Sequence, residues 1–83
     1  MTALRTFLVE AYAPASSECD VLAHQMDTTA GRQNSIRRLR SILVPEDEIC
    51  FHIFEAESAD SLAEAVAQAE VRAQRIVEVD VTD

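Results

Sequence analysis

Two runs rich in β-forming residues, 36–44 and 49–56, flank a short charged turn that begins with Pro45. Runs of this length and composition on either side of a turn are typical of a β-hairpin. The turn, residues 45–48, is long enough to favour one of the longer hairpin loops over a two-residue turn. The middle of the chain is therefore predicted to be an antiparallel pair of strands, around which the other elements must be arranged.

The segment before the hairpin predicts one strand and one helix. Side chains of residues 4–11 alternate between two faces, as in a strand. Pro14 should end this strand, because proline has no backbone N–H to donate to a neighbouring strand. Apolar residues then recur at helical spacing, so a helix is expected over 18–29, with Gly31 suited to its C-terminus.

The segment after the hairpin predicts a second helix and a last strand. Ser58 or Asp60 can cap the helix. Its apolar stripe is rich in alanine and consists of Leu62, Ala65, Val66, Ala69 and Ala73. Residues 75–81 alternate valine with acidic residues, which indicates a strand.

The resulting order, β-α-β-β-α-β, is that of the ferredoxin-like split βαβ arrangement. Right-handed crossovers place both helices on the same face of the sheet in this arrangement. We therefore expect one α+β domain spanning residues 1–83, with two helices on one face of a four-stranded antiparallel sheet.

The strand over 49–56 is apolar on both faces. Phe51 and Ile53 lie on one face, and Cys50 and Phe54 lie on the other. The two helices can cover only one face, and a second copy of the sheet needs only one self-complementary surface to cover the other. We predict a homodimer with its sheets packed face to face, a dimeric α+β barrel. The alternative is a monomer with an uncovered apolar face.

The composition excludes several kinds of partner. The net charge is −8 and every basic residue is arginine, so phosphates would be repelled and neither nucleic acid nor an anionic membrane is an expected partner. No apolar run has the length of a membrane-spanning helix, and residues 1–5 do not resemble a signal segment. Cys19 and Cys50 form no Cys-x-x-Cys pair and are predicted to be reduced thiols in a cytoplasmic protein.

Cys50 and His52 are the first candidate ligand-binding residues. They are two residues apart on one strand, so their side chains point to the same face. Such a pair can supply two metal ligands or a thiolate activated by an imidazolium. A complete metal site needs further donors, and Glu10, Glu55 or a partner chain could supply them only if they fell on that face, so no metal site is predicted. The alternative is that both residues are packed in a sheet interface.

Arg38, Arg40 and Tyr12 complete the candidate set. Arg38 and Arg40 are expected to share a face, where they could hold a carboxylate or phosphate in bidentate fashion. Their alternative role is to neutralise acidic neighbours. Tyr12 closes the first strand at a rim, where it could cap a ligand pocket or pack at the edge.

The chain also resembles a known family over nearly its whole length. Residues 43–48, 50–56, 61–69 and 75–79 resemble a family of small bacterial ferredoxin-like proteins described as a domain of unknown function or as nickel-binding-protein-like. The resemblance implies a ferredoxin-like fold and an α+β-barrel dimer. Metal-binding relatives carry histidines near the end of strand one and late in helix two. The corresponding positions here hold Ala11 and Glu70, so the family's metal site is not expected in this chain.

Three functions remain open from the sequence. The first is a homodimeric binding module that holds a small apolar or anionic ligand in a cleft between sheet and helices, with no cofactor. The second is a cofactor-free isomerase or monooxygenase on the same dimeric barrel, with His52 as a base that titrates near neutral pH. The third is a structural or regulatory subunit without a ligand.

Overall fold

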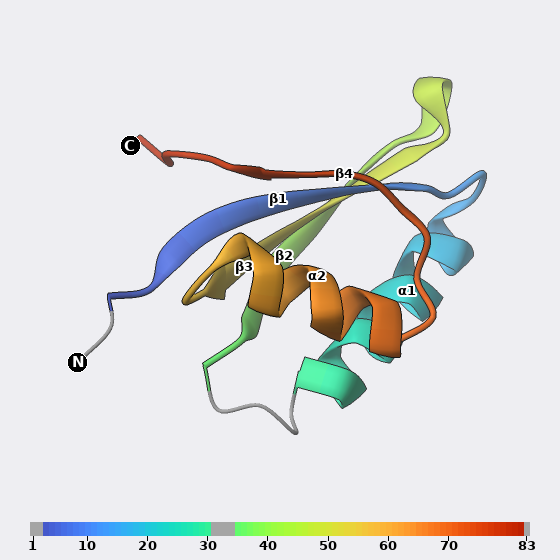
Figure 1. Ribbon diagram of the computed structural model, residues 1–83. Helices are drawn as coiled ribbons and strands as arrows, with labels where there is room; N and C mark the ends of the chain where they lie inside the picture. Colours follow the sequence, from blue (N-terminus) through green and yellow to red (C-terminus); the bar gives the residue numbers. More distant parts are fainter. Residues whose placement is uncertain (1–2, 31–34, 83) are drawn as a thin grey trace.

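The computed structural model describes residues 3–30 and 35–82 (Figure 1). Its elements, in chain order, are β1 (Arg5–Tyr12), α1 (Ser16–Ala30), β2 (Arg37–Val44), the 3-10 turn η1 (Pro45–Asp47), β3 (Ile49–Ala56), α2 (Ala59–Gln68) and β4 (Ala73–Glu78). This order confirms the predicted β-α-β-β-α-β arrangement. The predicted C-terminal residue of the first helix, Gly31, lies outside the described residues.

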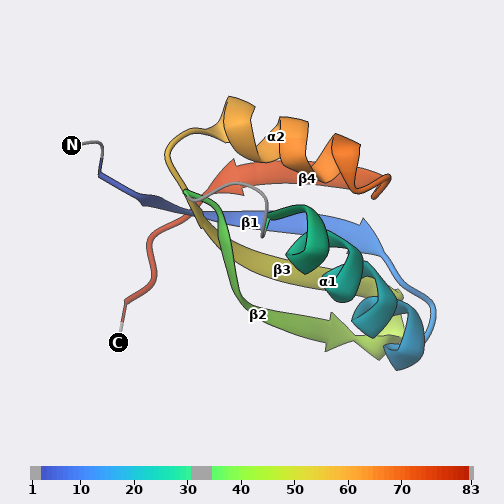
Figure 2. The ribbon, with the colours of Figure 1, turned by 90° about the horizontal axis from the view of Figure 1, so that it is seen from below.

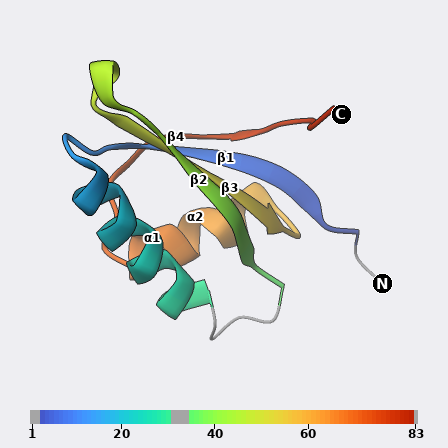
Figure 3. The same cartoon turned by 180° about the vertical axis from the view of Figure 1, so that it is seen from behind.

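The strands form one antiparallel four-stranded sheet with the order β2-β3-β1-β4. Both helices lie on the same side of the sheet (Figures 1 and 3). Figure 2 looks onto this side, where α1 contacts β2 and α2 contacts β3 and β4. The predicted ferredoxin-like α+β fold is therefore confirmed, and the sheet has one face covered by helices and one open face.

Alternation in β1 and β3 divides their side chains between these two faces. The helix-covered face carries Phe7, Val9 and Ala11 from β1 and Cys50, His52, Phe54 and Ala56 from β3, all buried. Against them α2 packs Leu62, Ala65 and Val66, and α1 packs Met26. Burial of these apolar groups is the main contribution that holds the layers together.

The connection between β2 and β3 is a tight, proline-started turn, as predicted. Pro45 occupies the beginning of η1, where its fixed φ fits the helical conformation and its missing N–H costs nothing. Glu48 ends the turn in the left-handed region at φ 54°, and its N–H donates to the Pro45 carbonyl at 3.2 Å.

Helix α2 begins as the sequence predicts and ends earlier. The Ser58 hydroxyl accepts a hydrogen bond from the Ser61 N–H, which makes Ser58 the cap. The predicted apolar stripe is wrong at its end, because Ala73 belongs to β4 and pairs with Ala11. The chain leaves the helix through Glu70, whose φ of 61° turns it toward the sheet. The predicted last strand, 75–81, therefore starts two residues too late, and the observed strand ends at Glu78.

Candidate functional site

The helix-covered face holds a buried sulfur-containing cluster near the N-terminus of α1. Cys50 and His52 point into the interface as the sequence predicts, and both have 0% exposure. Cys19, the fourth residue of α1, lies against Cys50. Ala13 completes this small cluster, which is separate from the main apolar core.

The prediction of two reduced thiols is wrong for this structure, which joins Cys19 and Cys50 in a disulfide. Their Cα atoms are 5.8 Å apart, within the usual range for a disulfide. The two residues are 31 positions apart in the sequence and meet only because the first turn of α1 lies against the start of β3. No local Cys-x-x-Cys pattern could indicate this pairing.

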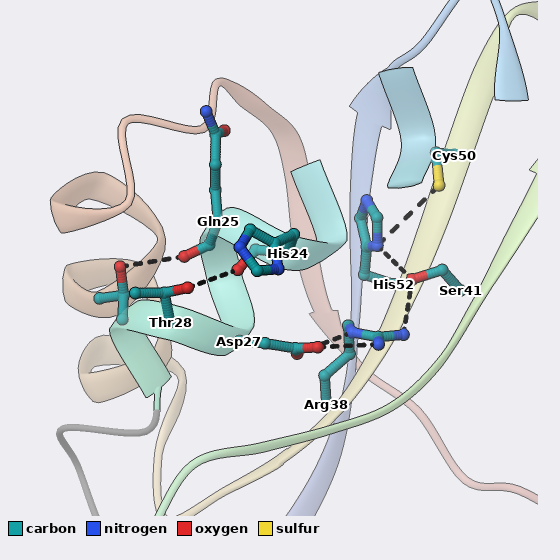
Figure 4. Close-up of polar contacts among 9 residues, drawn as sticks. His24, Gln25, Asp27, Thr28, Arg38, Ser41, Cys50 and His52 are labelled. Carbon is teal, nitrogen blue, oxygen red and sulfur yellow. Dashed lines mark hydrogen bonds and ion pairs between the residues drawn. The ribbon is translucent and has the colours of Figure 1, made fainter. Parts of the chain in front are cut away.

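A chain of polar contacts leads from His52 to the surface (Figure 4). The Ser41 Oγ lies 2.5 Å from His52 Nδ1, and Arg38 Nη1 donates to the same Oγ at 3.1 Å. Arg38 also donates two hydrogen bonds, at 2.8 and 2.9 Å, to the two carboxylate oxygens of Asp27 on α1. Arg38 therefore neutralises an acidic neighbour, which is the alternative role that the sequence left open for it.

Burial lowers the pKa of His52 from 6.5 to about 4, because the enclosed site disfavours the imidazolium. The nearby Arg38 guanidinium lowers this pKa further, and Asp27 opposes the shift. His52 is therefore neutral at neutral pH. His52 therefore does not have the properties expected of a catalytic base, which would titrate near pH 7 and face a substrate.

Arg40 lies on the other side of the sheet from Arg38, so the expectation that the two share a face is wrong. The register of β2 against β3 shifts between Arg38 and Arg40: Arg38 pairs with Phe54, and Arg40 pairs with Ile53. One extra residue, Leu39, produces this β-bulge and turns Arg40 to the open face. Arg40 forms no ion pair or hydrogen bond with another side chain among residues 3–30 and 35–82.

A groove of about 520 Å³ crosses the open face beside Arg40. Its walls come from three strands and from the segment after β4; they consist of Thr6, Leu39, Arg40, Ile42, Ile53 and Val81. Apart from Thr6 and Arg40 the lining is aliphatic. The groove can therefore accommodate an apolar group next to a single cation.

Tyr12 lies at the rim, as predicted, and is 55% exposed. Its hydroxyl donates to the Glu48 carboxylate at 3.4 Å, and the charge of Glu48 raises the pKa of the phenol. Tyr12 pairs with Ile49, whereas Arg40 pairs with Ile53 further along β3, so Tyr12 does not line the groove.

The five predicted ligand residues thus belong to three places. Arg38, Cys50 and His52 lie on the helix-covered face, Arg40 lies in the open groove, and Tyr12 lies at the rim. Sequence reasoning missed Cys19, Ser41 and Asp27 as partners of the first group. Cys19 stands at helical spacing from the apolar residues Leu22 and Met26, and this spacing was the available signal that it faces the sheet.

The predicted ligand cleft between sheet and helices is filled by side chains where the two layers meet. No room for a water molecule remains between the side chains of Met26, Ile36, Phe54, Leu62, Ala65 and Val66. A ligand at this position would have to displace core side chains.

Comparison with known proteins supports the fold alone. No family model matches the chain, and no curated protein matches it. The crystal structure of SCO4226 from Streptomyces coelicolor A3(2) is similar, with a TM-score of 0.76 and 17% sequence identity over 94% of this chain and 99% of that one. This likeness agrees with a small ferredoxin-like domain, and the resemblance to the nickel-binding-protein-like family is not confirmed. Within the described residues, none of the helices is both long enough and apolar enough to span a membrane.

Proposed function

We propose that the protein is a homodimeric binding module in which a second copy covers the open face of the sheet. The apolar character of this face carries the proposal. Cross-strand partners lie on the same face, and the pairs Leu8 with Val77 and Ile42 with Phe51 lie opposite the buried side chains. Ile42 is 46% exposed in the single chain. Contiguous apolar surface of this kind is typical of an interface.

The charge distribution favours a second copy of this chain as the occupant. Each chain carries −8, so two copies repel each other over most of their surfaces. On the open face the charges nearly cancel; they are those of Arg37, Arg40, Arg75, Glu10 and Glu55. Arg37 and Glu55 already form an ion pair at 2.7 Å. The open face is therefore where two copies can approach with little repulsion.

Pairing of two sheets would enclose the groove beside Arg40 between them. A ligand in this chamber would meet aliphatic walls and a guanidinium, which forms strong hydrogen bonds to a carboxylate. We therefore propose a small apolar anion, such as a medium-chain carboxylate, as the ligand class. This moves the ligand from the filled interface beneath the helices to the open face.

The dimer is tested by matched substitutions of two exposed apolar residues. Ile42→Glu places a charge on the open face, whereas Val21→Glu places the same charge on α1, where Val21 is 55% exposed. Sedimentation should give twice the 9.2 kDa chain mass for the wild type and Val21→Glu, and a folded monomer for Ile42→Glu. A wild-type monomer, or equal behaviour of the two variants, would refute the proposed interface.

The ligand class is tested by calorimetric titration with octanoate and with uncharged octanamide. Octanoate should bind more tightly, and Arg40→Gln should weaken it about tenfold, which corresponds to the loss of roughly 1.4 kcal/mol from a charge-assisted hydrogen bond. Arg37→Gln is the control, because it removes the same charge from a side chain already paired with Glu55. A dimer that binds neither compound would instead support the structural or regulatory alternative.

The enzyme alternative receives no support from His52, which is enclosed and neutral at pH 7. We retain the cytoplasm as the proposed compartment. Thiols are kept reduced there, so the Cys19–Cys50 pair would exist as two thiols for at least part of the time.

A further inference from the structure

Three potential metal ligands meet where the first turn of α1 lies against the start of β3. They are the sulfur atoms of Cys19 and Cys50 and a ring nitrogen of His52, and they lie within 4.8 Å of one another. Cys19 is 5% exposed, and Cys50 and His52 are 0% exposed. Glu10 and Glu55, which the sequence analysis considered as further donors, lie on the opposite face of the sheet. The third donor is instead Cys19, which the sequence analysis did not predict.

His52 has an unused polar atom in this enclosed position. Its Nδ1 contacts Ser41 Oγ and also lies 3.9 Å from Cys50 Sγ, whereas its Nε2 is buried without a hydrogen-bond partner among the described residues (Figure 4). Buried polar atoms in native proteins nearly always have a partner, and an exception calls for a physical reason. An ion held by Nε2 would supply one while Nδ1 keeps its contact with Ser41, because a neutral imidazole uses one nitrogen for the metal and the other for a hydrogen bond.

The contacts around His52 resemble the support that metal-binding histidines usually have. Ser41 holds one ring nitrogen, Arg38 donates to the Ser41 hydroxyl, and Asp27 fixes Arg38 from α1. Partners of this kind orient a ligand and set its tautomer. Cys19 also lies in the first turns of α1, where the helix dipole favours a thiolate.

We propose that reduction of the Cys19–Cys50 disulfide creates a binding site for one thiophilic d10 cation, Zn²⁺ or Cu⁺, with Cys19, Cys50 and His52 as ligands. Two thiolates and an imidazole are a ligand set that both ions accept. In a tetrahedral zinc site the bound sulfur and nitrogen atoms lie about 3.5–3.8 Å apart. Reduction therefore has to let the two sulfur atoms separate to this distance, and the imidazole nitrogen, which lies within 4.8 Å of them, has to approach.

The chemistry balances with a dithiol as reductant. The dithiol gives two electrons and two protons to the Cys19–Cys50 bond, which breaks to two thiols while the dithiol closes to a cyclic disulfide. The two thiols then lose their protons to solvent as two metal–sulfur bonds form. In the oxidised chain each sulfur is bonded to the other, so the site is closed to metal.

The test compares oxidised and reduced protein. Wild-type protein is reduced with dithiothreitol, desalted without oxygen, and titrated separately with Zn²⁺ and Cu⁺ against a competing chelator, with native mass spectrometry for stoichiometry. The reduced chain should bind one ion per subunit, and the oxidised chain should bind at least about a hundredfold more weakly, since even outer-shell losses weaken metal binding by about 10–100-fold. Equal binding by both forms overturns the proposal.

Substitutions identify the ligands. Cys19→Ala and His52→Gln should each lose tight binding, whereas His24→Gln, which removes an exposed histidine from the same helix as Cys19, should keep it. Retention by Cys19→Ala overturns the site.

X-ray absorption on the loaded wild type does not depend on variants that fold. For zinc it should show two sulfur neighbours at about 2.3 Å and nitrogen at about 2.0–2.1 Å. A coordination shell of oxygen alone would show surface carboxylates as the ligands and overturn the proposal. The ion that competes better with its chelator distinguishes Zn²⁺ from Cu⁺.

Discussion

Acidification should destabilise the protein through His52. The imidazole ionises at 6.5 in its ordinary environment and at about 4 in the fold, mainly because burial disfavours the charged form. Between these values the unfolded chain binds a proton that the folded chain does not. The contribution of neutral His52 to the free energy of unfolding is therefore fully present above pH 6.5 and is lost as the pH falls toward 4.

The magnitude follows from the two ionisation constants. At pH 4.5 protonation of this histidine in the unfolded chain lowers the free energy of unfolding by about 2.5 kcal/mol. The full pKa shift corresponds to roughly 3 kcal/mol. Carboxylates also contribute to acid unfolding, so the quantity to compare is the difference between wild type and a variant without this imidazole.

The assay is urea unfolding at pH 7 and pH 4.5, at one protein concentration, with the disulfide intact. Wild type should lose about 2.5 kcal/mol more than His52→Gln between these pH values. His24→Gln, an exposed histidine on α1, is the control and should follow wild type. Parallel losses in wild type and His52→Gln, or titration of the His52 imidazole near pH 6.5 by NMR, would refute the reasoning.

Three further tests show how the fold is held together, each by the free energy of unfolding of substituted proteins. Ser58→Ala removes the cap of α2 and should cost about 1 kcal/mol, whereas Ser58→Asp keeps an acceptor and should cost little; equal losses would contradict the cap. Leu62→Ala empties a fully buried position and should cost about 2–5 kcal/mol, against under about 0.5 kcal/mol for Val21→Ala on the exposed side of α1. In a double-mutant cycle, Arg38→Gln and Asp27→Asn should show a coupling of about 1 kcal/mol, since the pair is bidentate but part-exposed; a coupling of zero would mean that it contributes nothing.

The order of elements could be predicted because the patterns in the strands and helices are local. β3 alternates between faces along its whole length, and the proline that starts the hairpin turn sets its position. The start of α2 could be predicted from Ser58, because a helix cap acts within a few residues of its own position. These signals do not require knowledge of which elements touch.

The candidate site could not be predicted because its contacts are long-range. The bulge at Leu39 carries no glycine or proline, so strict alternation placed Arg38 and Arg40 on one face. Arg38 instead turns toward Asp27, on a helix that the sequence pattern cannot orient. Cys19 reaches Cys50 for the same reason.

Isotope-filtered NMR on a mixture of ¹³C-labelled and unlabelled protein tests the central claim, that a second copy covers the open face. In mixed dimers, the methyl groups of Ile42 and Ile53 in one copy should show NOEs to the ring of Phe51 in the other. These residues are cross-strand neighbours on the open face. Cross-copy NOEs that involve Val21 on α1 instead, or none at all, would contradict the account.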